Sequence, residues 1–150
     1  MESSENNGPY NIWAEEEITV EFYDVDPLQV VWHGNYINYF EIGRRCLLEK
    51  IGYDYNQMKE SGFAFPVTKI SAKYIGSLHY KDRATVKAIL VEYENLLRIR
   101  YEIRNTRTGQ LITKGVSTQM AYDLNNEKSC FECPEILIKK VETLFNGKKS

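Results

Sequence analysis

The clearest pattern in the chain is a strict alternation of apolar and charged residues from Leu97 to Arg104, with the apolar residues at the odd positions. This period of two predicts a β-strand that buries one face. Apolar and β-branched runs predict further strands over residues 18–23, 65–77, 84–93 and 111–122. The segment Thr106–Gly109 has the composition of a hairpin turn between the last two strands.

One long helix is predicted over residues 35–51. Its large apolar residues and one glycine recur at spacings of three and four, which places them on one stripe: Tyr36, Tyr39, Phe40, Gly43, Leu47 and Ile51. Asn35 is a good N-cap, and Gly52 is suited to end the helix. Because the stripe is so rich in large apolar groups, we expect a sheet to wrap around this helix.

Two shorter segments complete the expected elements. Residues 54–62 are more polar and predict a small helix or an irregular loop. Residues 134–145 predict a terminal helix with Pro134 in its first turn. The order is then a strand, a long helix and four strands joined by short turns. This order indicates an α+β fold in which an antiparallel sheet packs against one helix.

The chain has 150 residues, of which 43% are hydrophobic and 27% charged, as is typical of one soluble globular domain. The formal net charge of −2 gives no indication of nucleic-acid binding. No apolar stretch has the length needed to span a bilayer. Residues 1–14 resemble a flexible polar tail without the features of a signal peptide. We therefore expect one domain over residues 15–150 and a cytoplasmic location.

Three cysteines argue against a disulfide framework. Cys130 and Cys133 form a C-x-x-C pair, but a zinc site needs four ligands, and the chain adds only Cys46, His33 and His79. The pair precedes Pro134 in a late loop, whereas a redox pair is expected where a helix follows a strand. We expect reduced loop thiols, no metal and no bound cofactor.

The candidate chemistry lies in the segment Asp24–Tyr36, between the first strand and the long helix. It combines two carboxylates, Asp24 and Asp26, with His33 just before the helix start. The first amides of a helix lack intrahelical partners and favour negative charge. Such a terminus is suited to stabilise the oxyanion formed from a carbonyl or thioester.

This segment and the order of elements resemble the hotdog-fold acyl-CoA thioesterases, in particular the 4-hydroxybenzoyl-CoA thioesterase and YbgC-like branch. The branch pattern is roughly D-x-D-x-x-G-[VI]-V-[WY]-[HY]-x-x-Y, and the resemblance covers about residues 16–122. The chain matches the pattern at Asp24, Asp26, Val30, Val31, Trp32, His33 and Tyr36. The glycine of the pattern is Gln29 here, which implies a different loop path or an added side-chain contact.

The resemblance implies an antiparallel sheet of about five strands around helix 35–51. It also implies a homodimer, or a tetramer of two dimers, with active sites between subunits. The implied activity is hydrolysis of an acyl-CoA thioester to the free acid and CoA. Asp26 would be the nucleophile or general base, and the backbone N–H of His33 would be an oxyanion donor. Candidate substrate contacts are Trp32, Asn35, Tyr36 and Tyr39, with Lys69, Lys73 and Arg98 as possible phosphate contacts.

Several alternatives stay open at this point. Asp26 could cap a turn before Pro27, and core or dimer packing explains the aromatic candidates equally well. Asp24 is expected to be structural and to bond loop amides. Glu41 is the alternative base, because a second thioesterase branch uses a helix glutamate; its other expected role is an ion pair with Arg45.

Two other functions compete with a CoA thioesterase. One is a thioesterase that acts on acyl carrier protein, which would require a basic surface beside the site entrance. The acidic turn Glu92–Asn95 mildly favours this alternative, because the hydroxybenzoyl branch carries basic residues there for the phosphates of CoA. The other is a protein that binds acyl thioesters without turnover.

Overall fold

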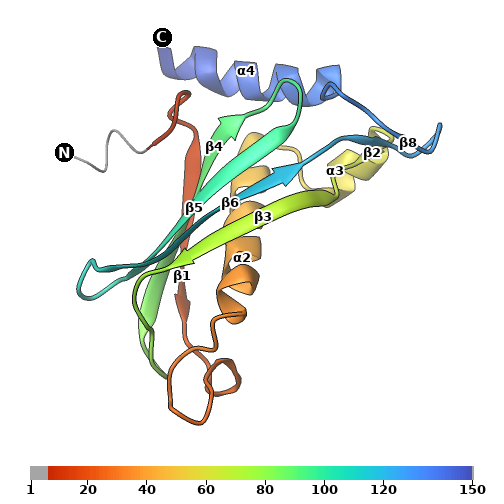
Figure 1. Cartoon of the computed structure of the whole chain (residues 1–150). Helices are drawn as coiled ribbons and strands as arrows, with labels where there is room; N and C mark the ends of the chain where they lie inside the picture. The colour runs from red at the N-terminus through yellow and green to blue at the C-terminus, as the bar shows by residue number, and fades with distance from the viewer. Residues whose placement is uncertain (1–6, 150) are drawn as a thin grey trace.

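A five-stranded antiparallel sheet wraps one long helix in the computed structural model, which describes residues 7–149 (Figure 1). The strand order is β1-β4-β5-β6-β3. The strands are β1 Trp13–Thr19, β3 Val67–Tyr74, β4 Arg83–Glu92, β5 Leu97–Asn105 and β6 Leu111–Gln119. Helix α2 (Asn35–Ile51) packs on one face of the sheet, and α4 (Glu135–Lys149) lies across one end of it. The α+β architecture predicted from the sequence is therefore confirmed.

Smaller elements connect these parts. A single 3-10 turn, η1 (Phe22–Asp24), follows β1, and the short helix α3 (Tyr55–Glu60) follows α2. A small three-stranded sheet joins β2 (Phe63–Ala64), β7 (Tyr122–Asp123) and β8 (Lys128–Ser129). The helix expected at the C-terminal end of the chain is present as α4.

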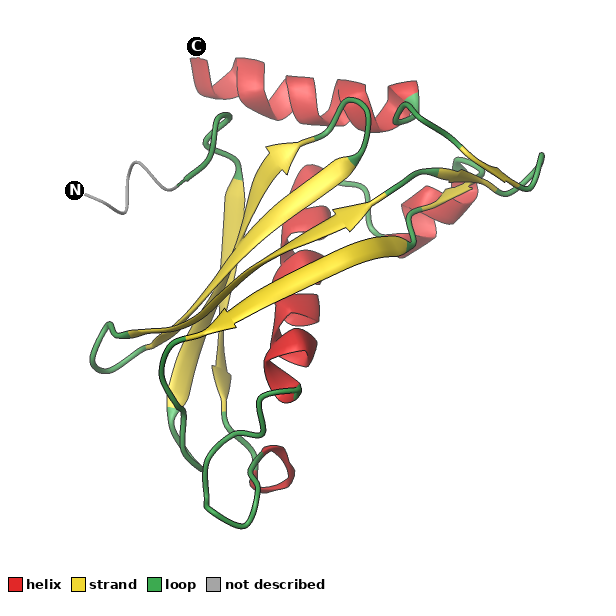
Figure 2. Cartoon of the chain, in the orientation of Figure 1, coloured by secondary structure: helices red, strands yellow, loops and turns green. Residues whose placement is uncertain are grey.

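The alternation predicted for β5 sorts its residues onto two faces. The apolar residues Leu97, Ile99, Tyr101 and Ile103 are buried, and Tyr101 stacks on Phe40 of α2 with ring centroids 4.7 Å apart. We call the face that contacts α2 the inner face. The charged residues between them lie on the opposite side, the outer face. In Figure 2 the strands pass in front of the long helix, so that the outer face is turned toward the reader.

Glycines allow α2 to approach the inner face closely. A Cβ atom at Gly115 of β6 would lie 2.5 Å from both the Phe40 ring and the carbonyl oxygen of Ser71. A Cβ at Gly43 of α2 would lie 2.9 Å from Val86 Cγ1. Both distances are shorter than van der Waals contact, so the seating of the helix depends on the absence of these atoms.

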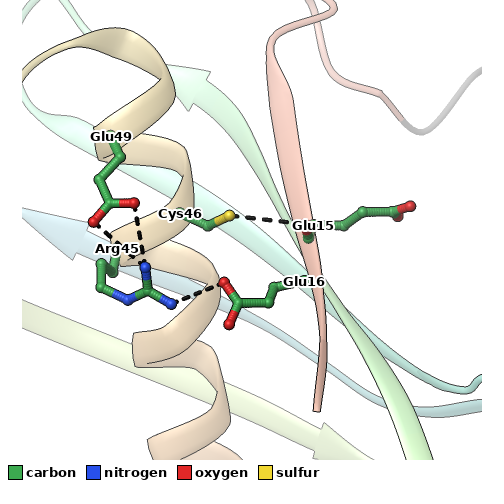
Figure 3. Close-up of polar contacts among 5 residues, drawn as sticks. All are labelled: Glu15, Glu16, Arg45, Cys46 and Glu49. Atoms are coloured by element: carbon green, nitrogen blue, oxygen red, sulfur yellow. Dashed lines mark hydrogen bonds and ion pairs between the residues drawn. The ribbon is translucent and has the colours of Figure 1, made fainter.

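The opposite flank of α2 is attached to the edge strand β1, as Figure 3 shows. Arg45 donates to Glu16 at 2.8 Å and also pairs with Glu49 at 3.2 Å, while Cys46 Sγ contacts the Glu15 carbonyl oxygen at 3.7 Å. Exposed pairs of this kind contribute little stability. They do show which flank of α2 faces β1. The other flank of α2 faces α3 and β3.

The first strand begins earlier than residues 18–23, within the segment that was predicted as a tail. Ile12 is fully buried and Trp13 begins β1, whereas residues 1–6 lie outside the described part of the chain. The expected alternation ends after Val20, because Phe22 and Tyr23 are exposed in the 3-10 turn. An alternating pattern therefore continued past the end of the actual strand.

Two further boundaries differ from the prediction. The strand expected over residues 65–77 is shorter at both ends: β3 covers Val67–Tyr74 and pairs with β6, and the separate strand β2, which pairs with β7 in the small sheet, comes before it. The N-cap of α2 is Gly34 rather than Asn35, which is the first helical residue. The end of α2 is as predicted, because Gly52 has a left-handed φ of 87° and its N–H bonds back to the last turn.

We predict that Gly115→Ala lowers the free energy of unfolding by about 1–3 kcal/mol, because the added methyl forces Phe40 or the neighbouring strand to move. Lys69→Ala on the outer face is the matched control, because Lys69 is exposed and lies opposite the uncharged Thr118, and it should stay within about 0.5 kcal/mol of wild type. Denaturant unfolding measures both. Equal midpoints for Gly115→Ala and wild type would contradict the close seating of α2.

Candidate active site

The segment between β1 and α2 forms a small hairpin beside the N-terminus of α2. Val25 and Val31 form an isolated antiparallel bridge, and the Asp26 N–H donates to the Val30 carbonyl at 2.9 Å. The Val31 N–H donates to the Leu78 carbonyl at 2.9 Å, which attaches the hairpin to the loop after β3. Asp26 therefore lies on one limb of a hydrogen-bonded hairpin whose other limb leads directly into the helix.

Asp24 anchors this hairpin to α2. Its Oδ2 atom accepts hydrogen bonds from the Glu21 N–H at 3.0 Å and from the buried Tyr39 hydroxyl at 2.9 Å. Its carbonyl oxygen accepts from the Trp32 N–H at 3.1 Å and from Asn35 Nδ2 at 2.9 Å. The structural role predicted for Asp24 is confirmed.

Burial raises the pKa of Tyr39 far above its ordinary value, and the hydrogen bond to Asp24 raises this pKa further. Tyr39 therefore remains a protonated donor to Asp24 at alkaline pH, where an exposed tyrosine would lose its proton. Tyr36 is also buried; its hydroxyl accepts from the Leu78 N–H at 3.2 Å, and burial is the main cause of its raised pKa. Both hydroxyls thus hold the loops in place, and neither ring is open to solvent.

Asp26 uses one carboxylate oxygen to shape the hairpin tip. Its Oδ1 atom accepts from the Leu28 N–H at 2.9 Å and from the Val30 N–H at 3.4 Å. The turn-capping role that stayed open for Asp26 is therefore present. Within residues 7–149, no hydrogen-bond donor contacts Oδ2, and the residue is half-buried. One oxygen fixes the carboxylate, and the other is available for chemistry.

Gln29 occupies the position where the family pattern has glycine. It has a φ of 71°, in the left-handed region, and its N–H donates to the Asp26 carbonyl at 2.8 Å. A non-glycine residue held in this region costs on the order of 1 kcal/mol. The hydrogen bond to Asp26 closes the turn, so the backbone of Gln29 keeps a conformation that glycine would take without strain.

Two amides stand unpaired at the start of α2. Within the described part of the chain, no acceptor lies within hydrogen-bond range of the N–H groups of His33 and Gly34, and Gly34 has no side-chain cap. A helix of 17 residues follows, so these amides lie at the positive end of its dipole. They form a ready site for a negatively charged oxygen.

Aromatic rings connect these amides to the edge strand β3. The exposed His33 ring lies 5.4 Å from Trp32 and 5.6 Å from Tyr74, and Tyr74 lies 5.9 Å from Tyr36. Trp32 and Tyr74 are half exposed, at 54% and 46%. Tyr74 is the last residue of β3 and was not among the predicted site residues. The only sequence signal for Tyr74 was that it continues the alternation of Ile70 and Ala72, which places it on the inner face.

A family model described as the thioesterase-like superfamily matches residues 20–141. The chain belongs to this superfamily. The match spans the hairpin, α2 and every strand of the main sheet except β1, and it confirms the predicted resemblance to hotdog-fold thioesterases and the prediction of a thioester hydrolase.

Individual relatives of this thioesterase-like chain are also named as thioesterases. It is 30% identical to YneP of Bacillus subtilis, named for a proposed acyl-CoA thioesterase activity, over 77% of this chain and 83% of YneP. A DHNA-CoA thioesterase structure from Staphylococcus aureus superimposes with a TM-score of 0.75 at 28% identity, over 92% and 96% of the two chains. An acyl-acyl carrier protein thioesterase from Arabidopsis thaliana chloroplasts is 34% identical over 49% of this chain and 39% of its own length.

Glu41 of this thioesterase-like chain is paired differently from the prediction. It forms its ion pair with Arg44, whereas the expected partner Arg45 binds Glu16 and Glu49. Arg44 is buried, and its Nη2 also donates to the Tyr55 hydroxyl at 2.8 Å. Glu41 is thus a half-exposed carboxylate whose charge is neutralised by a neighbour on the same helix.

The predicted phosphate contacts lie on the outer face. Lys69 and Lys73 alternate with the inner-face residues Ile70 and Tyr74, and Arg98 is in register with Thr118 beside Lys69. The structure therefore does not bring these three cations together with Asp26 on one side of the sheet.

The cysteine pair predicted to be reduced does not form a second functional site. Cys130 and Cys133 are free thiols, and burial raises the pKa of Cys133 to about 12. Across residues 7–149, no group of three His, Cys, Asp or Glu side chains is arranged to hold a metal ion. None of the helices in this part of the chain has the length and apolar character needed to cross a membrane.

We predict that Tyr39→Phe lowers the free energy of unfolding at pH 7 by about 1–3 kcal/mol, because it removes a hydrogen bond to a carboxylate. The raised folded pKa adds a pH signature. The stabilisation that Tyr39 contributes is complete below the ordinary tyrosine pKa of 10.0. It is lost as the pH rises through the raised pKa of Tyr39 in the folded protein. Above pH 10, stability should therefore fall less steeply in Tyr39→Phe than in wild type. Parallel curves in alkaline denaturation would contradict this role.

Proposed function

We propose that the protein hydrolyses acyl-CoA thioesters to the free acid and CoA, with Asp26 as the catalytic carboxylate and the His33 N–H as an oxyanion donor. The observation that carries the proposal is that one short segment between β1 and α2 contains both a fixed carboxylate and two unpaired helix amides. The names of YneP and the Staphylococcus aureus structure support the substrate class.

The chemistry follows from these two groups. Asp26 either attacks the thioester carbon, so that CoA thiolate leaves and water hydrolyses the resulting anhydride, or it takes a proton from an attacking water. In both routes the carbonyl oxygen gains negative charge, which the His33 and Gly34 amides can receive. Asp26 ranks above Glu41 because its Oδ2 is unpaired, whereas Glu41 is neutralised by Arg44.

The edge strand β3 is suited to pair with a second copy of the chain. The other edge strand, β1, presents Glu15, Glu16 and Glu17 in succession, and charged edges resist pairing. Around β3, by contrast, Val67, Tyr74 and Ile75 are exposed by 38%, 46% and 47%. We infer a dimer joined at β3, in which burial of these side chains closes the open edge.

This pairing would complete the active site. Antiparallel strands place the Tyr74 end of one copy beside the Val67 end of the other. An apolar hollow of about 630 Å³ lies at the Val67 end and is lined by Tyr55, Met58, Lys59, Phe63, Ala64, Phe65, Pro66, Tyr122 and Leu124. In the dimer, this hollow would lie beside the Asp26 and His33 of the other copy. It is the proposed acyl-binding groove.

We predict that Asp26→Asn lowers kcat for acyl-CoA hydrolysis at least about a hundredfold. Asparagine keeps an oxygen that can accept from the Leu28 N–H, so folding should be unchanged. Asp123→Asn is the matched control, because Asp123 caps a similar turn through the amides of Asn125 and Asn126. Release of free thiol measures turnover. Near-normal turnover of Asp26→Asn would remove Asp26 from the mechanism and favour Glu41.

A mixed dimer tests the shared site. Leu124→Trp should fill the acyl-binding groove of its own copy, which serves the Asp26 of the other copy, and each variant dimer alone should be weakly active. A dimer with one Asp26→Asn copy and one Leu124→Trp copy has one intact site, so it should recover about half of wild-type activity. Verified mixed dimers that stay as inactive as the parents would rule out a groove supplied by the partner.

A further inference from the structure

The outer face of the sheet is basic next to its β3 edge, although the whole chain has a net charge of −2. The outward positions of β3, β5 and β6 carry the cations Lys69, Lys73, Arg98, Arg100, Arg104 and Lys114. Glu102 is the acidic residue among these outward positions of the three strands. We call this set of cations the basic face.

Carboxylates neutralise only part of the basic face. Arg98 pairs with Glu92 at 2.8 Å and Arg104 with Glu102 at 3.6 Å. In contrast, Lys69, Lys73 and Lys114 are exposed and have no carboxylate of the described residues within ion-pair distance.

Two of these lysines face each other across neighbouring strands of the sheet. Lys73 and Lys114 lie directly opposite each other in the register of β3 and β6, whereas on its β5 side Lys114 lies opposite Glu102. Like charges at such positions are destabilising. They line a surface hollow of about 590 Å³ together with Ser71, Arg100, Glu102 and Arg104. An anionic partner in this hollow would relieve the repulsion.

The basic face borders the candidate active site. Lys73 precedes Tyr74 in β3, and Tyr74 points to the other side of the strand, where its ring contacts His33. A single strand therefore separates the cations from the aromatic rings beside the helix amides. Because the dimer closes the edge along β3, a thioester carried by a group bound on the outer face would reach the site past the end of this strand at Tyr74.

We propose that the basic face is the docking surface for an acidic acyl carrier protein, which presents its acyl group as a phosphopantetheine thioester. This inference rests on the proposed function and names the carrier of the substrate. From Arg98 to Arg104 the cations extend over roughly 20 Å at the usual rise per strand residue. Such an extended face matches a charged protein surface better than a single cluster of phosphates.

Other occupants fit the basic face less well. A second copy of this chain would oppose cations with cations, which disfavours association through this surface. A single-stranded nucleic acid would need exposed aromatic residues for stacking, and the hollow is lined by none. Charge complementarity therefore favours an acidic protein.

The test compares one acyl group on two carriers. The acyl-CoA that is hydrolysed fastest is matched by acyl carrier protein loaded with the same acyl group. In Lys73→Glu/Lys114→Glu, kcat/KM for the acyl carrier protein should fall at least about tenfold, mainly through KM, since electrostatic steering is lost. The value for acyl-CoA should change less than twofold. Lys128→Glu/Lys139→Glu makes the same charge change elsewhere and should leave both substrates unaffected.

Binding separates this inference from the proposed function. Acyl carrier protein should bind Asp26→Asn, and the added Lys73→Glu/Lys114→Glu change or higher salt should weaken that binding. Equal losses for acyl-CoA and acyl carrier protein would assign the basic face to the phosphates of CoA and overturn the inference. Turnover of acyl-CoA without any binding of acyl carrier protein would also overturn it, while leaving the proposed function intact.

Discussion

The hydrogen bonds of Asp24 are the constraint on which the candidate site depends. One residue receives the Tyr39 hydroxyl, the Glu21 N–H, the Trp32 N–H and the Asn35 amide. These bonds connect the end of β1, the hairpin and the first two turns of α2. Because the Tyr39 donor is buried, the contact is shielded from water and specific in direction. Asp26 and the free helix amides are thereby held in one rigid unit.

Local patterns in the sequence were sufficient for the elements with strong periodicity. The range of α2 was predicted correctly, although its N-cap is Gly34 and not Asn35, because its apolar stripe repeats at three and four and Gly52 takes the left-handed conformation that ends a helix. The alternation of β5 was equally reliable. The end of β1 was predicted too late because Phe22 and Tyr23 continue the alternation, although they are exposed in a 3-10 turn.

The site was predictable only where the chain itself brings residues together. The hairpin that holds Asp26 and His33 is local, so its motif could be read directly. The partner of Glu41 depended on distant residues: Glu16 of β1 binds Arg45, and Tyr55 of α3 binds Arg44. The contact of Tyr74 with His33 likewise depends on the position of β3 at the sheet edge. Such choices are fixed by the tertiary fold and have no signature in a single sequence.

The edge strand β3 links three properties of the protein. Its exposed apolar residues favour pairing with a second copy, its inner-face Tyr74 contacts the site, and its outer-face lysines form part of the basic face. The measurement that tests the central claim most directly is thiol release by the wild-type protein from short-chain, long-chain and aromatic acyl-CoA esters. The account predicts clear turnover of at least one ester without added metal. A folded dimer that releases no thiol from any of them would contradict an acyl-CoA thioesterase.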